Sequence, residues 1–180
     1  MFNIFKSKPA PTRVTDKVTI DEKAKWQALF KLWQENKNTV FIFWFNESLE
    51  EAAAYFSSQT TEPVQLLTYR EAAGPQAGGK IPIFAEHYPL RSKENELYEK
   101  MNLKGVQVYS SLKEPLFLQF GGERIVELMK KLGIKEDEVL EHAMISNAIK
   151  NAQEKIAKKI SYEQSAQSQD DWFKRNLNQV

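Results

Sequence analysis

Hydrophobic side chains recur along the chain with two alternating spacings. Trp26, Leu29, Phe30 and Trp33 follow one another at i, i+3, i+4 and i+7, which places them on one face of an amphipathic helix. Residues 39–45 instead carry apolar side chains on both faces of an extended chain, as expected for a strand inside a parallel sheet. The two patterns predict a helix that leads directly into a buried strand.

This alternation continues through most of the chain. Further strands are predicted over residues 63–69, 81–85 and 106–110. Proline cannot donate a ladder hydrogen bond, so Pro82 predicts either that the strand at residues 81–85 lies at the edge of the sheet or that Pro82 lies at the start of that strand. Strands that alternate with helices predict an α/β fold with a parallel sheet. Four more helices are predicted. One covers residues 92–103. The other three are marked by apolar stripes at Leu49, Ala52, Ala53 and Phe56, at Ile125, Leu128, Met129 and Leu132, and at Ile145, Ile149, Ala152, Ile156 and Ile160.

Local signals mark where several of these elements begin and end. Thr19 and Glu22 fit a capping box at the start of the first helix, where each side chain accepts from a backbone N–H of the other's residue. Asn46 is placed to cap the second helix. Gly133 ends a later helix, because glycine readily adopts the left-handed conformation of that position. Residues 71–80 are rich in glycine and alanine and predict a loop.

The two ends of the chain differ from its middle. Residues 1–17 carry two prolines and scattered basic residues, which predicts a flexible arm. The tail, residues 161–180, is rich in glutamine and serine, with Trp172 and Phe173 embedded in it. A hydrophobic pair in a polar tail either covers the domain's own surface or anchors a partner, and both alternatives stay open.

Composition limits the kind of protein. A chain of 180 residues predicts one domain, or one domain with a helical extension. The net charge of +1, from 25 basic and 24 acidic residues, argues against nucleic acid or an acidic membrane as the partner. The chain has no cysteine, which excludes disulfides and thiolate sites. The start lacks the apolar run of a signal peptide and no stretch is long enough to span a bilayer, so we expect a soluble, cytoplasmic protein.

One segment imitates a phosphate-binding loop. Residues 74–80 match most of the pattern G-x-x-x-x-G-K-[ST], and Lys80 stands at the lysine position. Ile81 replaces the hydroxyl that would hold Mg²⁺, and Pro75 removes a backbone N–H. A strand is predicted directly after Lys80, whereas phosphate binding needs the N-terminus of a helix at this place. We therefore interpret the match as fortuitous.

The titratable residues form no catalytic or metal-binding pattern. The two histidines, His87 and His142, lack partners at the spacing of a zinc site. For His142 we expect a structural role, with its imidazole hydrogen-bonded at a turn before the last long helix. The carboxylates are predicted to lie on solvated helix faces. No catalytic residue, metal ligand or cofactor is assigned.

The segment after residue 120 carries the most specific pattern. Residues 120–133 read FGGERIVELMKKLG, and residues 141–155 read EHAMISNAIKNAQEK. Together they resemble the segment of SecA, the motor of bacterial preprotein translocation, that follows its last helicase motif. A weaker likeness to the second nucleotide-binding domain of that motor extends back to Val18. The resemblance implies a RecA-like α/β domain over residues 18–133, followed by a helical extension and tail over residues 134–180.

The resemblance fails at the positions that make the motor work. The family has a catalytic glutamine and several arginines in its last helicase motif. Glu96 stands at the glutamine position, and Tyr98, Lys100 and Leu103 stand at arginine positions. Only arginine offers a planar, permanently charged fork to a transferring phosphoryl group. The chain also lacks a counterpart of the first nucleotide-binding domain, so the resemblance implies no ATP hydrolysis.

The sequence thus predicts a non-catalytic SecA-like module that binds a protein and is linked to protein translocation. Trp172 and Phe173 are its candidate partner contacts. The alternative is a nucleotide-responsive domain that binds ATP or ADP without hydrolysis, with Arg91 and Lys100 as phosphate contacts. We expect no nucleic-acid partner and no stable membrane insertion. A homodimer is expected if the former interdomain face is exposed and apolar.

Overall fold

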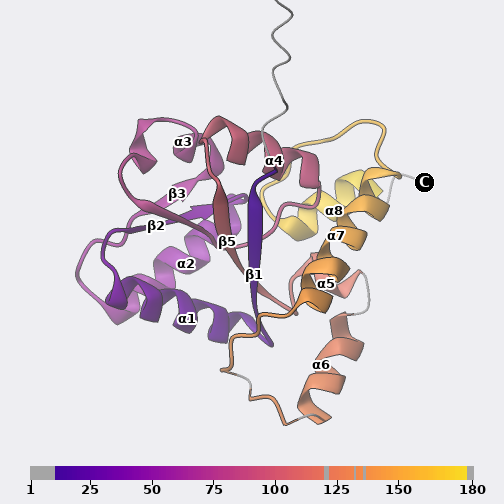
Figure 1. Ribbon diagram of the computed structural model, residues 1–180, viewed down its shortest axis with the longest axis horizontal. Coiled ribbons are helices and arrows are strands. Elements are labelled where there is room, and N and C mark those ends of the chain that lie inside the picture. Colours follow the sequence, from indigo (N-terminus) through magenta and orange to yellow (C-terminus); the bar gives the residue numbers. More distant parts are fainter. Residues whose placement is uncertain (1–10, 120–121, 132, 136, 178–180) are drawn as a thin grey trace, which may run out of the picture.

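The computed structural model describes residues 11–119, 122–131, 133–135 and 137–177. Its centre is one sheet of five parallel strands in the order β1-β5-β4-β2-β3 (Figure 1). Helices cover both faces of this sheet. The α/β prediction is confirmed, and the arrangement fits a RecA-like fold. The strands are β1 (Arg13–Thr19), β2 (Thr39–Phe43), β3 (Leu66–Thr68), β4 (Ile81–Phe84) and β5 (Gly105–Ser111).

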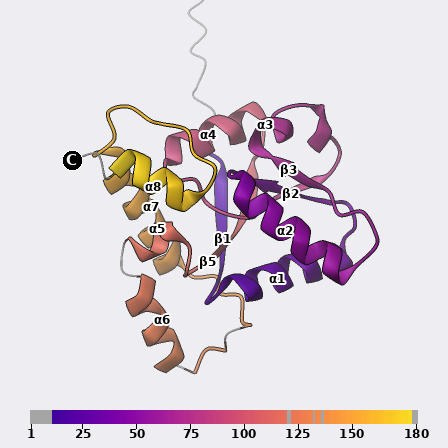
Figure 2. The ribbon, with the colours of Figure 1, turned by 180° about the vertical axis from the view of Figure 1, so that it is seen from behind.

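The helices form two layers, one on each face of the sheet, and β2 is apolar toward both of them. Phe41 and Phe43 face a core built with α1 and α2, whereas Val40 and Ile42 face a second core. That second core is shared with the helices that follow β4 and β5. Figure 2 shows α1 beside α2, with α7 and α8 across the strands from them. The helices are α1 (Glu22–Glu35), α2 (Asn46–Gln59), α3 (Tyr69–Ala72), η1 (Pro75–Ala77), α4 (Arg91–Lys100), α5 (Pro115–Leu118), α6 (Gly122–Lys131), α7 (Ala143–Ala157) and α8 (Gln169–Leu177).

The predicted flexible arm is wrong for its last five residues. Residues 13–17 belong to β1, which pairs with β5 from Arg13 opposite Gly105 to Thr19 opposite Ser111. The segment lacks an apolar pattern because it lies at the edge of the sheet and its buried Asp16 is neutralised by a tertiary partner. Residues 1–10 lie outside the described part of the chain. The division at residues 133 and 134 stays a prediction.

Pro82 illustrates how a strand-breaking residue fits inside a sheet. β4 lies between β2 and β5, so the edge alternative is wrong, but Pro82 is the second residue of its strand, as the other alternative predicted. Pairing with β5 begins only at Ile83, opposite Gln107. The N–H that proline lacks is therefore not needed for that ladder.

The caps predicted for the starts of α1 and α2 are wrong, whereas the glycine predicted after α6 is confirmed. Asp21, rather than Thr19, caps α1 and accepts from the backbone N of Ala24 at 2.9 Å. Asn46 is the first residue of α2, and its side chain donates to Gln167 at 2.9 Å instead of capping. Gly133 has φ +75, which agrees with the predicted left-handed residue after α6.

Candidate functional site

The strand order places a natural ligand site at one edge of the sheet. From β2 the chain crosses to β3 on one side, and it then returns to β4 on the other side of β2. In open parallel sheets, ligands bind outside the carboxyl ends of the strands at such a switch point. Trp44 and Phe45 follow β2 at this point, and residues 86–88 follow β4.

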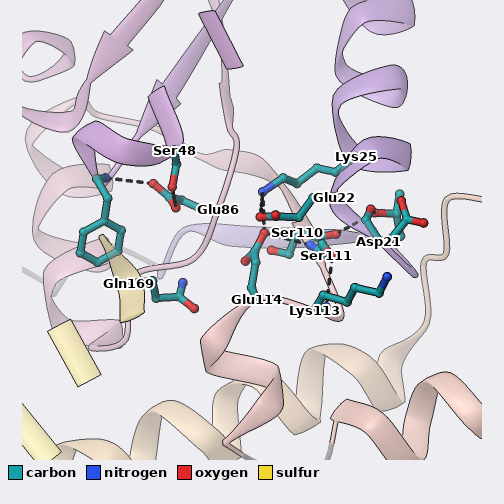
Figure 3. A network of polar contacts seen from close by, with 12 residues as sticks. Asp21, Glu22, Lys25, Ser48, Glu86, Ser110, Ser111, Lys113, Glu114 and Gln169 are labelled. Carbon is teal, nitrogen blue, oxygen red and sulfur yellow. Dashed lines mark hydrogen bonds and ion pairs between the residues drawn. The ribbon is translucent and has the colours of Figure 1, made fainter. Parts of the chain in front are cut away.

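Glu86 joins the two strand ends. Its Oε1 accepts from the backbone N of Trp44 and of Phe45, each at 2.9 Å. Its Oε2 accepts from the Ser48 hydroxyl in the first turn of α2, at 2.7 Å (Figure 3). Burial raises the pKa of Glu86 from 4.5 to about 7, although Lys25 and Ser48 oppose the rise. The carboxyl group is therefore a structural clamp that titrates near neutral pH.

An aromatic groove lies outside this clamp. Two cavities of about 470 and 540 Å³ adjoin there, and both are lined by Trp44, Tyr69, Arg70, Tyr88 and Ser165. We use the name aromatic groove for these two cavities together. Each volume lies within the range of about 300 to 1,000 Å³ that is typical of small-molecule pockets. The groove is therefore large enough for a ligand or for several residues of a partner.

The rings of the groove hold one another in place. Trp44 stacks on Tyr69 with centroids 5.1 Å apart, and its centroid is 5.0 Å from that of Tyr88. The Tyr88 hydroxyl donates to Glu163, which also accepts from Trp172 Nε1 at 2.9 Å. Trp44 Nε1 is buried but has no hydrogen-bond partner in the part of the chain that the structure describes. A buried donor without an acceptor is costly, so Trp44 is held in an energetically unfavourable position beside the groove.

Charged side chains of both signs line the groove. Arg70, Lys93 and Lys100 are balanced in number by Glu71, Glu96 and Glu163. Glu163 accepts from two neutral donors, and Glu96 lies 3.7 Å from Lys93. Arg70 and Lys100 therefore offer local cationic contacts in a groove whose charges balance.

His87 lies behind the groove as a fixed charge. Its Nε2 donates to Asp16 at 2.9 Å and its Nδ1 to Glu94 at 2.8 Å. Burial alone lowers the pKa of His87, but the two carboxylates outweigh it and raise the pKa to about 10. Gln153 of α7 donates to Glu94 at 2.9 Å and to the Tyr88 carbonyl at 2.8 Å. This network ties β1, α4 and α7 to the strand end that carries the groove.

No family model matches the chain. Among curated proteins, the protein translocase subunit SecA of Acinetobacter baumannii is 39% identical over 85 residues, which is 45% of this chain and 9% of that protein. SecA of Methylococcus capsulatus is 35% identical over 114 residues, 61% of this chain and 13% of its own length. SecA 1 of Alkaliphilus metalliredigens is 34% identical over 85 residues, 45% of this chain and 10% of its own length.

The chain is similar to SecA over about half of its length. It spans only about a tenth of these relatives, from 9% to 13% of each. The likeness predicted from the pattern after residue 120 is confirmed at this level. Its assignment to one nucleotide-binding domain of SecA stays a prediction.

The two residues predicted to contact phosphate lie apart. Arg91 and Lys100 are the first and last residues of α4, and ten helical residues span about 15 Å. Lys100 lines the aromatic groove, whereas Arg91 lines a different cavity beside Asp16 and His87. The structure therefore places only Lys100 at the candidate site.

The tail folds back on its own domain. Trp172 is 0% exposed and Phe173 is 3% exposed, and their rings pack edge to face 5.3 Å apart. Trp172 also packs against Tyr88 at 6.1 Å, behind the groove. Of the two alternatives, the structure has the one in which the pair covers the domain's own surface. A partner reaches them only if α8 is displaced, and their role as partner contacts stays a prediction.

The remaining motifs have structural roles. Lys80 follows a 3₁₀ helix and leads directly into β4, so the phosphate-loop match has no helix N-terminus behind it, as predicted. His142 caps α7, and its Nδ1 accepts from the backbone N of Met144 at 3.1 Å, which confirms the expected hydrogen bond. Within the described residues, no group of three or more His, Asp or Glu is arranged to hold a metal ion. None of the helices described reaches the length and apolarity that a membrane crossing requires.

Sequence reasoning missed the groove and the His87 network. The groove draws on Trp44, Tyr69 and Tyr88, which come from three separate segments. In the sequence, Trp44 belongs to a continuous apolar run, where core packing is the expected role. The one available signal for His87 is Glu94, seven residues further on, whereas Asp16 is 71 residues away.

Proposed function

We propose that the chain is a SecA-like module that binds a partner protein in protein translocation and does not hydrolyse ATP. The link to translocation rests on its similarity to the protein translocase subunits named above. We further propose that it corresponds to the second nucleotide-binding domain of SecA in degenerate form. The resemblance places Tyr98, Lys100 and Leu103 where that motor has arginines.

The observation that carries the binding role is the aromatic groove, which is lined by the rings of Trp44, Tyr69 and Tyr88. An apolar side chain of a partner peptide would pack against these rings. The two adjoining cavities share their rings, so one extended segment can occupy both. Arg70 and Lys100 can each pair with an acidic residue of such a segment.

Tyr98 supports the loss of catalysis. By the resemblance, Tyr98 takes the position of an arginine in the last helicase motif of SecA. It is 0% exposed, and its ring packs edge to face against Phe84 with centroids 4.9 Å apart. A side chain buried in this way offers no charge to a phosphoryl group. Lys100 keeps a charge but lacks the bidentate geometry of arginine.

The test is capture of a partner from native cell extract with three baits. We expect the wild-type chain and an Lys23→Glu/Lys31→Glu control, altered on the exposed face of α1, to capture the same protein. An Arg70→Glu/Lys100→Glu variant makes the same change of charge at the groove and should lose it. Equal capture by all three baits would overturn the groove as the binding site.

A second readout reports on the groove itself. The chain has four tryptophans, so its NMR spectrum contains four indole N–H signals, and Trp44→Phe identifies the one from Trp44. Addition of the captured partner should shift this signal more than those of Trp26 and Trp33, which lie in the core under α1. ATP turnover by the purified chain that Lys100→Ala abolishes would contradict the non-catalytic assignment.

One observation favours a nucleotide-responsive domain as the second candidate. The Trp44 and Tyr69 rings could stack on a base while Lys100 and Arg70 of the same groove hold a phosphate. Calorimetry with ATP and with ADP separates the candidates. Binding heat that Lys100→Ala removes would favour this function, and its absence at millimolar nucleotide would eliminate it.

A further inference from the structure

A second, acidic pocket lies at the same edge of the sheet. This cavity of about 120 Å³ opens between the first turns of α1, α2 and α8 and the segments that follow β4 and β5. Six carboxylates line it: Glu22, Glu47, Glu51, Glu86, Glu114 and Asp170. We use the name acidic pocket for this cavity. Its volume is that of a side-chain end group rather than of a whole small molecule.

Lys25 compensates for only part of this negative charge. Its Nζ lies 2.7 Å from Glu114 Oε1 and 3.9 Å from Glu22, and Lys25 is 1% exposed. Burial alone lowers the pKa of Lys25, but Glu114 and Glu86 outweigh it and raise the pKa. Figure 3 shows Glu114 and Lys25 on one side of the network, with Glu86 and Gln169 on the other.

Glu114 supplies an independent sign of a missing partner. Both of its donors, Lys25 Nζ at 2.7 Å and the backbone N of Ser111 at 2.9 Å, bind Oε1. Oε2 is buried without a hydrogen-bond partner among the described residues, although Glu114 is only 4% exposed and lines the acidic pocket. A buried carboxylate oxygen without a donor is strongly unfavourable. The cavity beside it is where such a donor would sit.

Helix termini account for part of the acidic clustering. Glu22, Glu47 and Asp170 lie in the first turns of α1, α2 and α8, where the helix dipole favours negative charge. These dipoles provide no donor for Glu114 Oε2. Burial together with Glu22 and Glu47 also raises the pKa of Glu51, so the carboxylates repel one another across the mouth of the pocket. A cation between them would relieve both effects.

We propose that the acidic pocket receives an arginine side chain from a partner protein. A guanidinium is planar and has five N–H donors, so it can donate to Glu114 Oε2 while it faces the carboxylates at the mouth. A divalent metal is a poorer match, because no metal-binding group is present among the residues described. The inference does not depend on the aromatic groove, whose lining residues are different.

An NMR titration of the whole chain tests the proposal, with N-acetyl-argininamide as the probe. The backbone amides of Ser48, Glu114 and Gln169 should shift and saturate at millimolar probe. The matched citrulline amide has the same shape without the charge, and it should cause no saturable shift. Magnesium chloride serves as the metal arm. Shifts with citrulline equal to those with arginine, or shifts with magnesium alone, would overturn the proposal.

Two charge-matched variants locate the binding. Glu47→Gln/Glu51→Gln neutralises the α2 side of the pocket and should weaken arginine binding about tenfold or more. Glu35→Gln/Glu99→Gln removes the same charge at exposed positions that do not line the pocket and should bind like the wild type. Glu114→Gln is less suitable, since it breaks the buried pair with Lys25. An equal loss of arginine affinity in both variants would show that the net charge alone causes the binding, and it would contradict a specific site.

Discussion

At the scale of single residues, buried charges decide how this chain responds to pH. Glu86 binds two backbone N–H groups and a hydroxyl, yet burial still raises its pKa to about 7. His87 lies between two carboxylates that raise its pKa to about 10. Both groups bind more protons in the folded state than in the unfolded state. Each therefore makes folding less favourable as pH rises through its own window.

For Glu86 this window lies between its unfolded pKa of 4.5 and its folded pKa of about 7. The wild type should lose stability across this range relative to Glu86→Gln, whose amide oxygen can still accept from the backbone of Trp44 and Phe45. Urea unfolding from about pH 5 to about pH 8 measures the difference. Exposed Glu96→Gln is the control. Parallel pH profiles for wild type and Glu86→Gln would contradict the raised pKa.

His87 stabilises the fold through its charge. The contribution should be complete below its unfolded pKa of 6.5 and lost as pH rises through about 10. At neutral pH, His87→Leu leaves Asp16 and Glu94 buried without their partner and should lower the free energy of unfolding by about 3 to 5 kcal/mol. Urea unfolding measures this loss. A variant as stable as the wild type would show that the two carboxylates do not need the imidazolium.

At the scale of elements, α8 is part of the core although it lies in a polar tail. Its sequence has few apolar residues, but Trp172, Phe173 and Gln169 are all buried. Gln169 accepts from the backbone N of Leu116 and donates to the His87 carbonyl at 3.0 Å. These contacts join α8 to α5 and to the segment after β4, which supports the back of the aromatic groove.

Replacement of Trp172, the aromatic side chain that anchors α8, should therefore destabilise the whole fold. We expect Trp172→Ala to lower the free energy of unfolding by about 3 to 5 kcal/mol, because it empties a fully buried site and removes a donor from Glu163. Tyr162 is 81% exposed, and Tyr162→Ala should change stability by less than about 0.5 kcal/mol. Denaturant unfolding compares the two. A small effect of Trp172→Ala would mean that α8 is not docked in solution.

At the scale of the whole molecule, charge and surface bear on partners. The net charge of +1 hides an uneven distribution, because charges of both signs line the aromatic groove whereas carboxylates line the acidic pocket. Both features lie outside the carboxyl ends of the strands. A protein partner with acidic and basic residues on one face could engage the two together. Nucleic acid has only negative charge to offer and would meet repulsion at the pocket.

A further prediction concerns the oligomeric state. A homodimer stays a prediction, and light scattering of the purified chain checks it. If the surface that carries the aromatic groove mediates the dimer, Arg70→Glu/Lys100→Glu should shift the mass toward the monomer. A monomer for the wild type at high micromolar concentration would contradict the dimer.

The sequence alone determined the class of fold because local patterns specify local structure. The apolar run at residues 39–45 predicted β2, and the stripe from Trp26 to Trp33 predicted α1. Hydrophobic spacing reports which face of an element is buried, and alternating elements restrict the topology to a parallel sheet. The likeness to SecA came from the same source, since it depends on the order of residues.

Only the tertiary structure decided the sites. Asp16 and His87 are 71 residues apart, and their contact gives the buried carboxylate of β1 its partner. Trp44 faces the groove because β2 ends there, which its apolar run does not reveal. The pKa of Glu86 and the unpaired oxygen of Glu114 depend on burial by segments far away in the sequence. Burial and the surrounding charges are properties of the packed chain, so sequence spacing cannot supply them.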